Sequence, residues 1–195
     1  MGGCKQVKIK GIIDECFNDY KKPAMYIAFP TCNFKCDKLN ECAICQNSAL
    51  IKEPDIDLPK EDIIVRYLNN PITQAIIFSG LEPFDSILDL VSFIDCFRRD
   101  YKCNDDIVIY TGYTEEELRT GMYDGGAQST LADFYKFITS FPNIIIKFGR
   151  FVMNDQPHYD EVLGVQLASH NQYAKEVGTN EPNVDNQEES RPDNI

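Results

Sequence analysis

The chain has 195 residues, of which 19 are basic and 31 acidic, so its formal charge is −12, and 43% of the residues are hydrophobic. This composition supports the core of one domain, or of two at most, and excludes a chain that is disordered throughout. A chain with this acidic charge lacks the basic surface of a nucleic-acid binder, so we expect no nucleic-acid partner. No apolar run approaches the roughly 18 residues of a membrane span, so we expect no membrane partner.

Five segments have the composition of β-strands. The first alternates between apolar and polar residues, whereas the other four are continuous apolar runs, which are typical of strands buried on both faces of a sheet. The predicted strands are Val7–Ile13, Ala24–Phe29, Gln74–Phe78, Asp106–Tyr110 and Asn143–Phe148.

Amphipathic segments lie between most of these strands and predict helices. Pro59 suits the first turn of a helix, and Thr114 with Glu117 three residues later forms a capping box. Apolar residues at helical spacing mark the other segments. The predicted helices are Pro59–Leu68, Asp85–Arg98, a helix that starts after Thr114, and Leu131–Ile138.

This alternation of strands and helices predicts an α/β fold in which helical crossovers connect parallel strands. Five strands are too few for a closed eight-stranded barrel, so we expect a partial, open parallel β/α barrel over residues 1–177. Residues 178–195 have no periodic apolar pattern and carry five acidic residues against one arginine, which predicts a disordered acidic tail.

Four loops that follow predicted strands carry residues suited to a functional site. They are Cys32–Cys45, Ser79–Phe84, Thr111–Thr114 and Gly149–Phe151. Because the carboxyl ends of parallel strands meet at one edge of a sheet, we expect these loops to converge on one rim.

The cysteines are concentrated in the first of these loops. Met1–Gln6 lacks the apolar core of a signal peptide, so we expect a cytoplasmic protein whose eight cysteines are mostly reduced. Four of them, Cys32, Cys36, Cys42 and Cys45, fall within fourteen residues. Such a cluster of reduced thiols favours metal binding over disulfides.

Two kinds of metal site fit this spacing. Four thiolates arranged as Cys-x3-Cys and Cys-x2-Cys can bind a structural zinc ion. Three thiolates can instead hold an iron–sulfur cluster and leave one iron without a protein ligand. A set of free, buried thiols is the remaining interpretation.

The turn Ser79-Gly80-Leu81-Glu82-Pro83 follows the next apolar strand after the cysteine loop. This pair of features resembles the radical S-adenosylmethionine (SAM) superfamily. The resemblance implies a 4Fe-4S cluster held by three cysteines, with SAM bound at the open iron. It also implies a radical SAM oxidoreductase, in which an electron from the cluster cleaves SAM into methionine and a 5′-deoxyadenosyl radical. No catalytic side chain is implied beyond the cluster and SAM.

Three further segments resemble the activating proteins of anaerobic ribonucleotide reductases within that superfamily. They are Tyr110–Leu118, Phe148–Val152 and Leu167–Gln172. The resemblance implies that the protein generates a glycyl radical on a large anaerobic ribonucleotide reductase or another glycyl-radical enzyme. It further implies an electron donor of the flavodoxin or ferredoxin type.

The cluster ligands implied by the resemblance are Cys32, Cys36 and Cys45. Cys45 is favoured because Cys45-Gln46-Asn47 matches the family pattern after its third cysteine, although the spacing from Cys36 is eight residues instead of two. Cys42 is the alternative third ligand. Leu81 replaces a family glycine, which preserves the backbone contact only if its φ is negative. Phe148 replaces a family aspartate.

The resemblance also implies a SAM site. The residues that we expect to contact SAM are Ile44, Cys45, Gln46, Ser79, Gly80, Leu81, Glu82, Arg150, Phe151 and Val152. Within this set, Gly80–Glu82 would hold the ammonium group of SAM, and Ile44 would offer apolar contact near the adenine. Tyr110, Thr111 and Tyr113 would lie on the rim near the ribose.

The short chain leaves little beyond the cofactor core to enclose a small substrate, which favours a protein segment as the substrate. Another small radical SAM enzyme is the nearest alternative, either one that activates a different glycyl-radical protein or one that modifies a small molecule. A zinc-binding module without catalysis is the alternative from another class. Iron–sulfur absorption after anaerobic reconstitution distinguishes the two cofactors.

Overall fold

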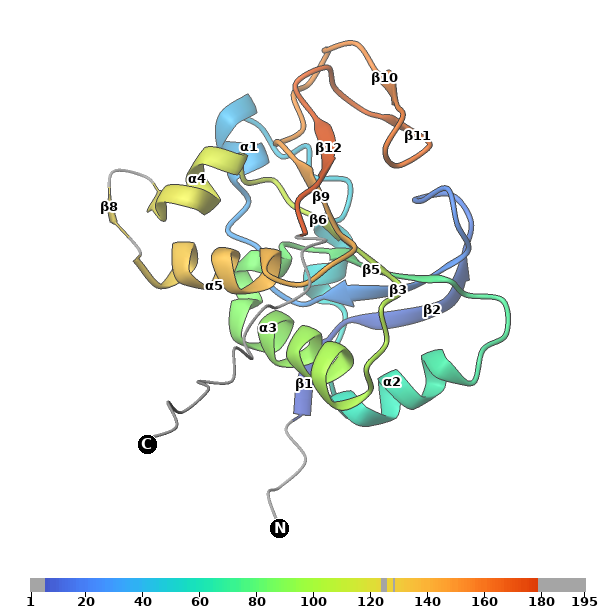
Figure 1. The fold of residues 1–195 in the computed structure, drawn as a ribbon. Coiled ribbons are helices and arrows are strands. Elements are labelled where there is room, and N and C mark those ends of the chain that lie inside the picture. The colour runs from blue at the N-terminus through green and yellow to red at the C-terminus, as the bar shows by residue number, and fades with distance from the viewer. Residues whose placement is uncertain (1–5, 124–125, 128, 179–195) are drawn as a thin grey trace, which may run out of the picture.

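A six-stranded mixed sheet runs through the protein, and the long helices pack against one of its faces (Figure 1). The computed structural model describes residues 6–123, 126–127 and 129–178. Apart from Gly178, the predicted acidic tail lies outside these described residues. The prediction of an α/β fold with a mostly parallel sheet is confirmed.

The four central strands of the sheet are parallel, and both edge strands are antiparallel to their neighbours. One edge is antiparallel because residues 17–23 connect its two strands, whereas a parallel crossover takes about a dozen residues or more. In spatial order the strands are β12 (Tyr173–Glu176), β9 (Ile144–Phe148), β6 (Asp106–Tyr110), β5 (Ala75–Gly80), β3 (Ala24–Phe29) and β2 (Gly11–Cys16).

The predicted strands β3 and β6 agree with the structure to the residue, and β5 and β9 agree to within two residues at each end. The prediction of one strand over Val7–Ile13 is wrong. The chain turns at Lys10, whose backbone N–H donates to Ala28 O at 2.7 Å, and the segment divides into β1 (Gln6–Ile9) and β2. β1 pairs with β4 (Ile56–Pro59), which the sequence pattern did not indicate.

The predicted helices are present with changed limits. α2 (Lys60–Leu68) and α5 (Ser129–Thr139) follow the apolar periodicity, and α4 (Glu115–Thr120) has the predicted capping box between Thr114 and Glu117. The predicted helix Asp85–Arg98 is divided: a 3-10 turn precedes α3 (Ile87–Asp95), and a π-helical turn over Cys96–Asp100 follows it.

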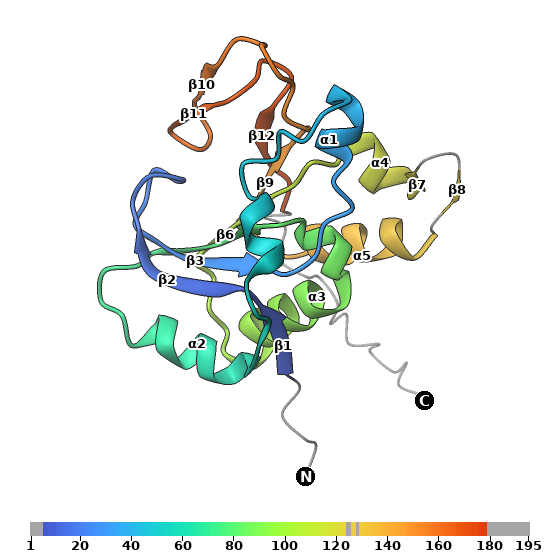
Figure 2. The ribbon, with the colours of Figure 1, turned by 180° about the vertical axis from the view of Figure 1, so that it is seen from behind.

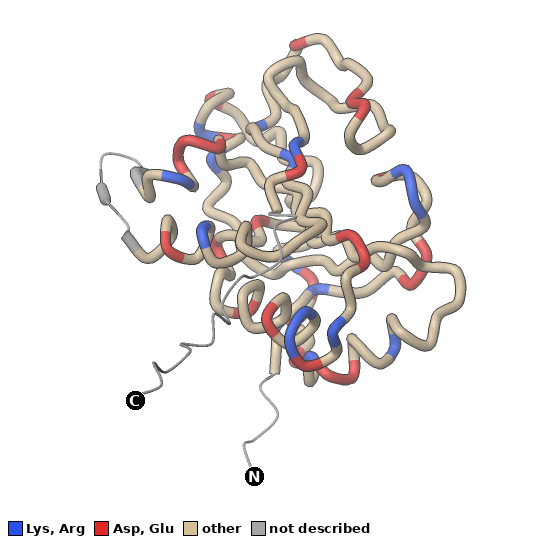
Figure 3. The backbone as a smooth tube through the Cα atoms, viewed as in Figure 1, with Lys and Arg blue, Asp and Glu red and all other residues tan. Residues whose placement is uncertain are grey.

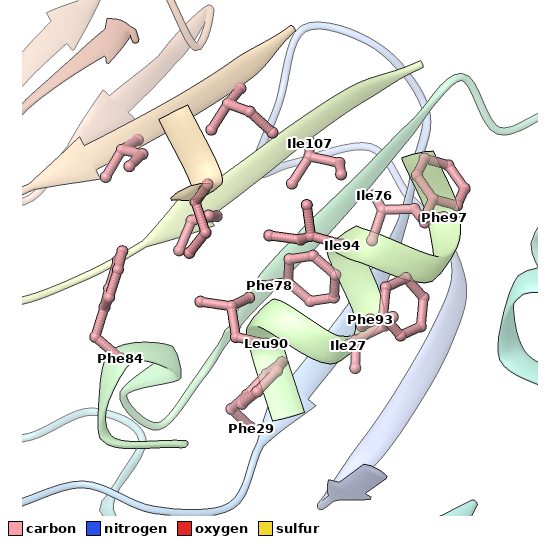
Figure 4. Close-up of a cluster of buried hydrophobic side chains, with 14 of the residues drawn as sticks. Ile27, Phe29, Ile76, Phe78, Phe84, Leu90, Phe93, Ile94, Phe97 and Ile107 are labelled. Carbon is pink, nitrogen blue, oxygen red and sulfur yellow. The ribbon is translucent and has the colours of Figure 1, made fainter. Parts of the chain in front are cut away.

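Two apolar clusters lie on opposite faces of the sheet. The larger is formed by the helices and by alternate residues of the strands, and Phe78 packs edge-on against Phe93 of α3 with ring centroids 5.2 Å apart (Figure 4). The smaller cluster contains Ile145 of β9 and Leu167 of β11 (Val165–Leu167). Helices therefore cover one face, while the other face is covered by loops and by the hairpin of β10 (His158–Asp160) and β11 (Figure 1).

Charged residues of both signs are interspersed along the backbone in the view of Figure 3. Among the described residues, no helix combines the length and the apolar character needed to cross a membrane. A short β-ribbon of β7 (Met122–Tyr123) and β8 (Gly126–Ala127) completes the secondary structure between α4 and α5.

Candidate functional site

A cavity of about 280 Å³ lies at the carboxyl ends of the parallel strands. All four loops that follow these strands contribute to its lining, and so does the segment 166–172. The structure brings together nine of the residues expected at the site: Cys32, Cys36, Cys45, Gln46, Ser79, Gly80, Leu81, Glu82 and Phe151. Ile44, Arg150 and Val152 lie outside the lining.

The cysteine loop contains a short helix that presents Cys36. α1 (Lys35–Asn40) is bracketed by Phe34 and Glu41, both in the left-handed conformation with φ of 53° and 54°. Residues other than glycine rarely adopt this backbone conformation, so the loop is held in a restricted shape. The backbone N–H of Phe34 donates to Cys32 Sγ at 3.2 Å, which orients the first thiol of the loop.

Asp37 closes the long segment between the second and third cavity cysteines. Its Oδ1 accepts hydrogen bonds from the backbone N–H groups of Ile44 (3.0 Å) and Cys45 (2.9 Å). Its backbone oxygen accepts from the N–H of Cys42 at 3.2 Å. The additional residues are thereby folded back, so that Cys45 reaches the cavity while Cys42 remains exposed and away from it.

We expect Asp37→Ala to lower the amount of iron that the reconstituted protein retains. The change removes the acceptor for two backbone donors, each worth roughly 1 kcal/mol, and releases the segment that carries Cys45. Asp37→Asn keeps an oxygen acceptor at Oδ1 and is expected to retain iron close to the wild-type amount. Iron and sulfide analysis after anaerobic reconstitution measures both. Equal iron in Asp37→Ala and wild type would contradict this role.

Two asparagines tie the cysteine loop to the rest of the site. Asn40 Nδ2 donates to Cys36 O (2.7 Å) and Phe151 O (3.0 Å), and its Oδ1 accepts from the N–H of Met153 at 2.7 Å. Asn47 Nδ2 donates to Gly80 O at 2.6 Å. The loop is therefore fastened both to the segment after β9 and to the turn after β5.

The turn after β5 depends on a glycine. Gly80 has a φ of 81°, and a Cβ at this position would lie 2.8 Å from Ala28 Cα, so no other residue fits without strain. Leu81, in the place of a family glycine, is buried and is absent from the residues with positive φ. Leu81 therefore has the negative φ that the backbone contact of the replaced glycine requires. The N–H groups of Leu81 and Glu82 donate to Phe29 O and Thr31 O.

We expect Gly80→Ala to destabilise the protein by about 2–5 kcal/mol, since the left-handed backbone and the contact with the backbone of β3 both oppose a methyl group. Gly11→Ala is the matched control, because a Cβ there meets no atom within 4 Å and its φ is not in the left-handed region. Urea denaturation of both variants measures the difference, and equal free energies of unfolding would contradict it.

Glu82 is a buried carboxyl group at the wall of the cavity. Its Oε1 accepts from Phe84 N–H (3.1 Å) and Thr111 Oγ1 (2.7 Å), and its Oε2 accepts from Gly112 N–H (2.8 Å). Burial raises the pKa of Glu82 to about 7, although the hydrogen bonds from Gly112 and Thr111 oppose this shift. The carboxylate is thus held by donors from the turn after β5 and from the loop after β6, and it is available to a cation in the cavity.

The residues expected near the ribose are divided by the structure. Tyr110 and Thr111 line the cavity, and the Tyr110 hydroxyl donates to Asp19 O. Tyr113 is buried behind the site, where its hydroxyl donates to Asp85 Oδ1 at 2.7 Å. The Asp85 carboxylate also accepts hydrogen bonds from the backbone N–H and the Nδ2 of Asn33. Asp85 therefore connects Tyr113 to the cysteine loop.

Arg150, expected near SAM, is engaged elsewhere. Its guanidinium donates to both carboxylate oxygens of Glu117 at 2.8 and 2.9 Å. Lys35 lies 3.8 Å from the same carboxylate, which joins α1 to α4, and the two helices lie side by side in Figures 1 and 2. Val152 N–H donates to Ser169 Oγ at 3.3 Å. These residues hold the rim together rather than line the cavity.

Several cavity residues were not among the contacts expected from the sequence, although Gly149 and Gln172 lie in segments that the sequence marked. Lys147 lines the cavity from β9, and the only available signal was a charged residue within an apolar strand. Gln172 Nε2 donates to Gly149 O at 3.2 Å, and a Cβ on Gly149 would lie 2.9 Å from Asn171 O. Gly149 therefore allows the segment near Gln172 to close over the end of β9.

The sequence leaves two cofactors open for the cysteine loop, a zinc ion and an iron–sulfur cluster. Three thiols, those of Cys32, Cys36 and Cys45, border one cavity, and thiolates are the ligands of iron–sulfur clusters. The fourth thiol of the loop, Cys42, lies outside the lining, so the structure offers this cavity the three-thiol set. Among the described residues, no group of three or more His, Cys, Asp and Glu side chains is arranged to hold a metal ion. In the number and kind of their donor atoms, the three cavity thiols fit a cluster ligated by three cysteines.

A comparison with protein families supports this donor set. A family model described as a 4Fe-4S single cluster domain matches residues 24–156, which is more than half of the chain. The match starts at the first residue of β3 and includes the cysteine loop, the turn after β5 and the segment after β9. A search of curated proteins finds no match.

Proposed function

The chain belongs to the family of 4Fe-4S single cluster domains, and from that membership we propose that it is a radical SAM enzyme with the open, partial β/α barrel of that superfamily. The family model is one found in radical SAM-type proteins. We propose further that the protein activates a glycyl-radical enzyme, with an anaerobic ribonucleotide reductase as the leading candidate.

One observation carries the proposal. The three thiols follow β3 and the buried carboxylate of Glu82 follows β5, yet all four groups border the same cavity. Cys32, Cys36 and Cys45 would hold the cluster. When bound, the cluster would supply the low-potential electron that cleaves the carbon–sulfur bond of SAM. The cysteine-loop motif and the Ser79–Pro83 turn would thus act as one site.

The chain's own groups would bind and orient SAM. Glu82 would accept the ammonium group, with its carboxylate already fixed by Thr111 and Gly112. The backbone of Gly80 and Leu81 would complete this contact. The buried side chain of Leu81 and the half-buried ring of Phe151 would exclude water from the reacting bond.

A protein segment is the proposed substrate. The cavity, at about 280 Å³, is just below the roughly 300–1,000 Å³ range of ligand sites and would be occupied by the cofactors. A glycine on an exposed loop of a partner could approach this rim without an enclosed pocket of its own. The segments Tyr110–Leu118 and Leu167–Gln172, which resemble the reductase-activating branch, border this rim.

Phe148 favours the alternative of a different target. It occupies the place of a family aspartate, yet its side chain is fully buried in the helix-side core, away from the cavity. The polar side chain that β9 contributes to the cavity is that of Lys147 instead. Activation of another glycyl-radical protein, or modification of a small molecule, is therefore the second candidate.

The proposal is tested with anaerobically reconstituted protein, SAM and a flavodoxin-, ferredoxin- or dithionite-type reductant. Formation of 5′-deoxyadenosine tests SAM cleavage, and a glycyl-radical electron paramagnetic resonance signal on an added reductase tests the target. No 5′-deoxyadenosine from protein that holds its cluster would overturn the radical SAM proposal. Cleavage without a radical on the reductase would favour the second candidate, and a colourless zinc protein would favour the binding module.

A further inference from the structure

A second cavity, of about 360 Å³, is bordered by the start of the cysteine loop, the turn after β5, the residue before the capping box of α4 and the first turn of α5. Among the described residues, none lines both this cavity and the first one. Its volume is within the roughly 300–1,000 Å³ of ligand sites, and the proposed cofactors leave it unused.

The same three segments border both cavities. Each places one residue in the first cavity and a near neighbour in the second: Cys32 and Asn33, Glu82 and Phe84, Gly112 and Tyr113. Because consecutive Cα atoms are about 3.8 Å apart, little more than the thickness of these segments separates the two cavities. A protein segment that approaches the rim of the first cavity could therefore also reach the second.

Asp85 brings a carboxylate to the second cavity. It is partly buried, and its hydrogen bonds come from neutral groups: Oδ1 accepts from Asn33 Nδ2 (3.0 Å) and the Tyr113 hydroxyl (2.7 Å), and Oδ2 accepts from Asn33 N–H (2.8 Å). A carboxylate has about four acceptor sites, so Oδ2 has one left for a ligand. A partly buried carboxylate with only neutral donors favours a cation at that position.

The basic side chains around Tyr113 pair with Glu117 instead of Asp85. The guanidinium of Arg150 donates to Glu117, and Lys35 Nζ lies 3.8 Å from the same carboxylate and 4.8 Å from the centroid of the Tyr113 ring. In the described part of the chain, no basic side chain forms an ion pair with Asp85. The cation that complements Asp85 would therefore come from another molecule.

The walls around Asp85 suit a cation on an apolar stem. Phe84 and Tyr113 are both buried and lie edge to face, with ring centroids 6.3 Å apart. Ile87 and Leu131 add aliphatic surface. An arginine side chain matches this combination, because its planar guanidinium binds carboxylates and stacks on rings while its methylene stem packs against apolar groups.

We propose that the second cavity binds an arginine side chain of a protein partner, with the guanidinium at Asp85. The bound arginine would anchor the partner and position its segment at the rim of the first cavity. The identification of this partner with a glycyl-radical enzyme rests on the proposed function, whereas the selection of an arginine does not.

The test titrates the cluster-loaded full chain, without SAM or reductant, with blocked pentapeptides that carry one central side chain between glycines. The central residue is arginine, lysine or citrulline, which is neutral and close to arginine in shape. Ligand-observed NMR measures the dissociation constants. The arginine peptide is expected to bind about tenfold more tightly than the citrulline peptide, as one charge-assisted hydrogen bond predicts, with the lysine peptide between them.

Two variants address the cavity directly. Thr130 is exposed and borders the cavity, so Thr130→Arg would place a guanidinium of the chain itself there and is expected to weaken binding of the arginine peptide about tenfold. Asp85→Asn is expected to remove the preference for arginine over citrulline. Asp133→Asn is the matched control, because Asp133 is exposed on the same helix α5, outside the lining, and its change should have no effect.

Several results would overturn the inference. They are equal affinities for the arginine and citrulline peptides, no detectable binding of either, and wild-type affinity in Thr130→Arg, which decides the matter if Asp85→Asn loses its cluster. Tighter binding of the lysine peptide, or of free spermidine, would assign the cavity to another amine. Absence of SAM cleavage would overturn the proposed function but leave these titrations unchanged, so the two failures are distinguishable.

Discussion

Replacing Cys45 with alanine is expected to abolish cluster retention, lowering bound iron by about an order of magnitude or more. Cys45 borders the cavity with Cys32 and Cys36, and two thiolates do not suffice to hold a 4Fe-4S cluster. Iron and sulfide analysis, together with the visible absorption of the reconstituted protein, measures the loss. The expected result assigns the third ligand, for which the sequence left two cysteines.

Cys42→Ala is the matched control. Cys42 is exposed and does not line the cavity, so its removal is expected to leave iron content and absorption close to those of the wild type. Loss of the cluster in Cys42→Ala and its retention in Cys45→Ala would show that Cys42 is the ligand. Loss in both variants would indicate that the exposed thiol also takes part.

The second large effect is expected at Glu82. Glu82→Gln removes the buried charge while preserving the size of the side chain, and we expect SAM to bind about 10–100-fold more weakly, as is typical for the loss of a charge-assisted hydrogen bond. The cluster should remain, because Glu82 is not among the proposed ligands. Calorimetric titration of the reconstituted variant with SAM measures the effect. Glu116→Gln, an exposed change of equal charge on α4, is the control.

The raised pKa of Glu82 gives this prediction a pH dependence. Burial moves the pKa from 4.5 to about 7, so the free site holds a neutral carboxyl group below about pH 7. SAM affinity should therefore fall as the pH decreases through 7 in the wild type and change less in Glu82→Gln. In the absence of ligand, the pH dependence of the protein's stability has the opposite sign. The stabilisation that Glu82 contributes to the folded state is complete below about pH 4.5 and is lost as the pH rises through 7. Equal SAM affinities in the two proteins would contradict this role.

The regular elements could be predicted from the sequence because their cause is local. β3 and β6 are continuous apolar runs that end at turn residues, and the structure has them at the predicted residues. The capping box of α4 is likewise a pattern of near neighbours in the chain. β1 pairs with β4, which lies far from it in the chain, and a local sequence pattern does not indicate such a distant partner. The prediction of a single first strand was therefore wrong.

The composition of the site was also predictable in part. The cysteine loop and the Ser79–Pro83 turn could be related to each other by their order along the chain and by the rule that carboxyl ends of parallel strands meet. That rule specifies which loops converge but not which side chains face inward. Arg150 was expected to contact SAM, yet it forms an ion pair with Glu117, and only the tertiary fold brings α4 next to the segment after β9.

The sequence by itself determined the alternation of strands and helices, the set of four loops and the clustering of thiols, because each depends on residues close together in the chain. The tertiary structure alone decided that Cys45 borders the cavity while Cys42 does not, because Asp37 folds the segment between them through backbone hydrogen bonds. It also decided that Glu82 and Lys147 face one cavity. That juxtaposition arises from the pairing of β5, β6 and β9 in one sheet, which relates residues far apart in the chain.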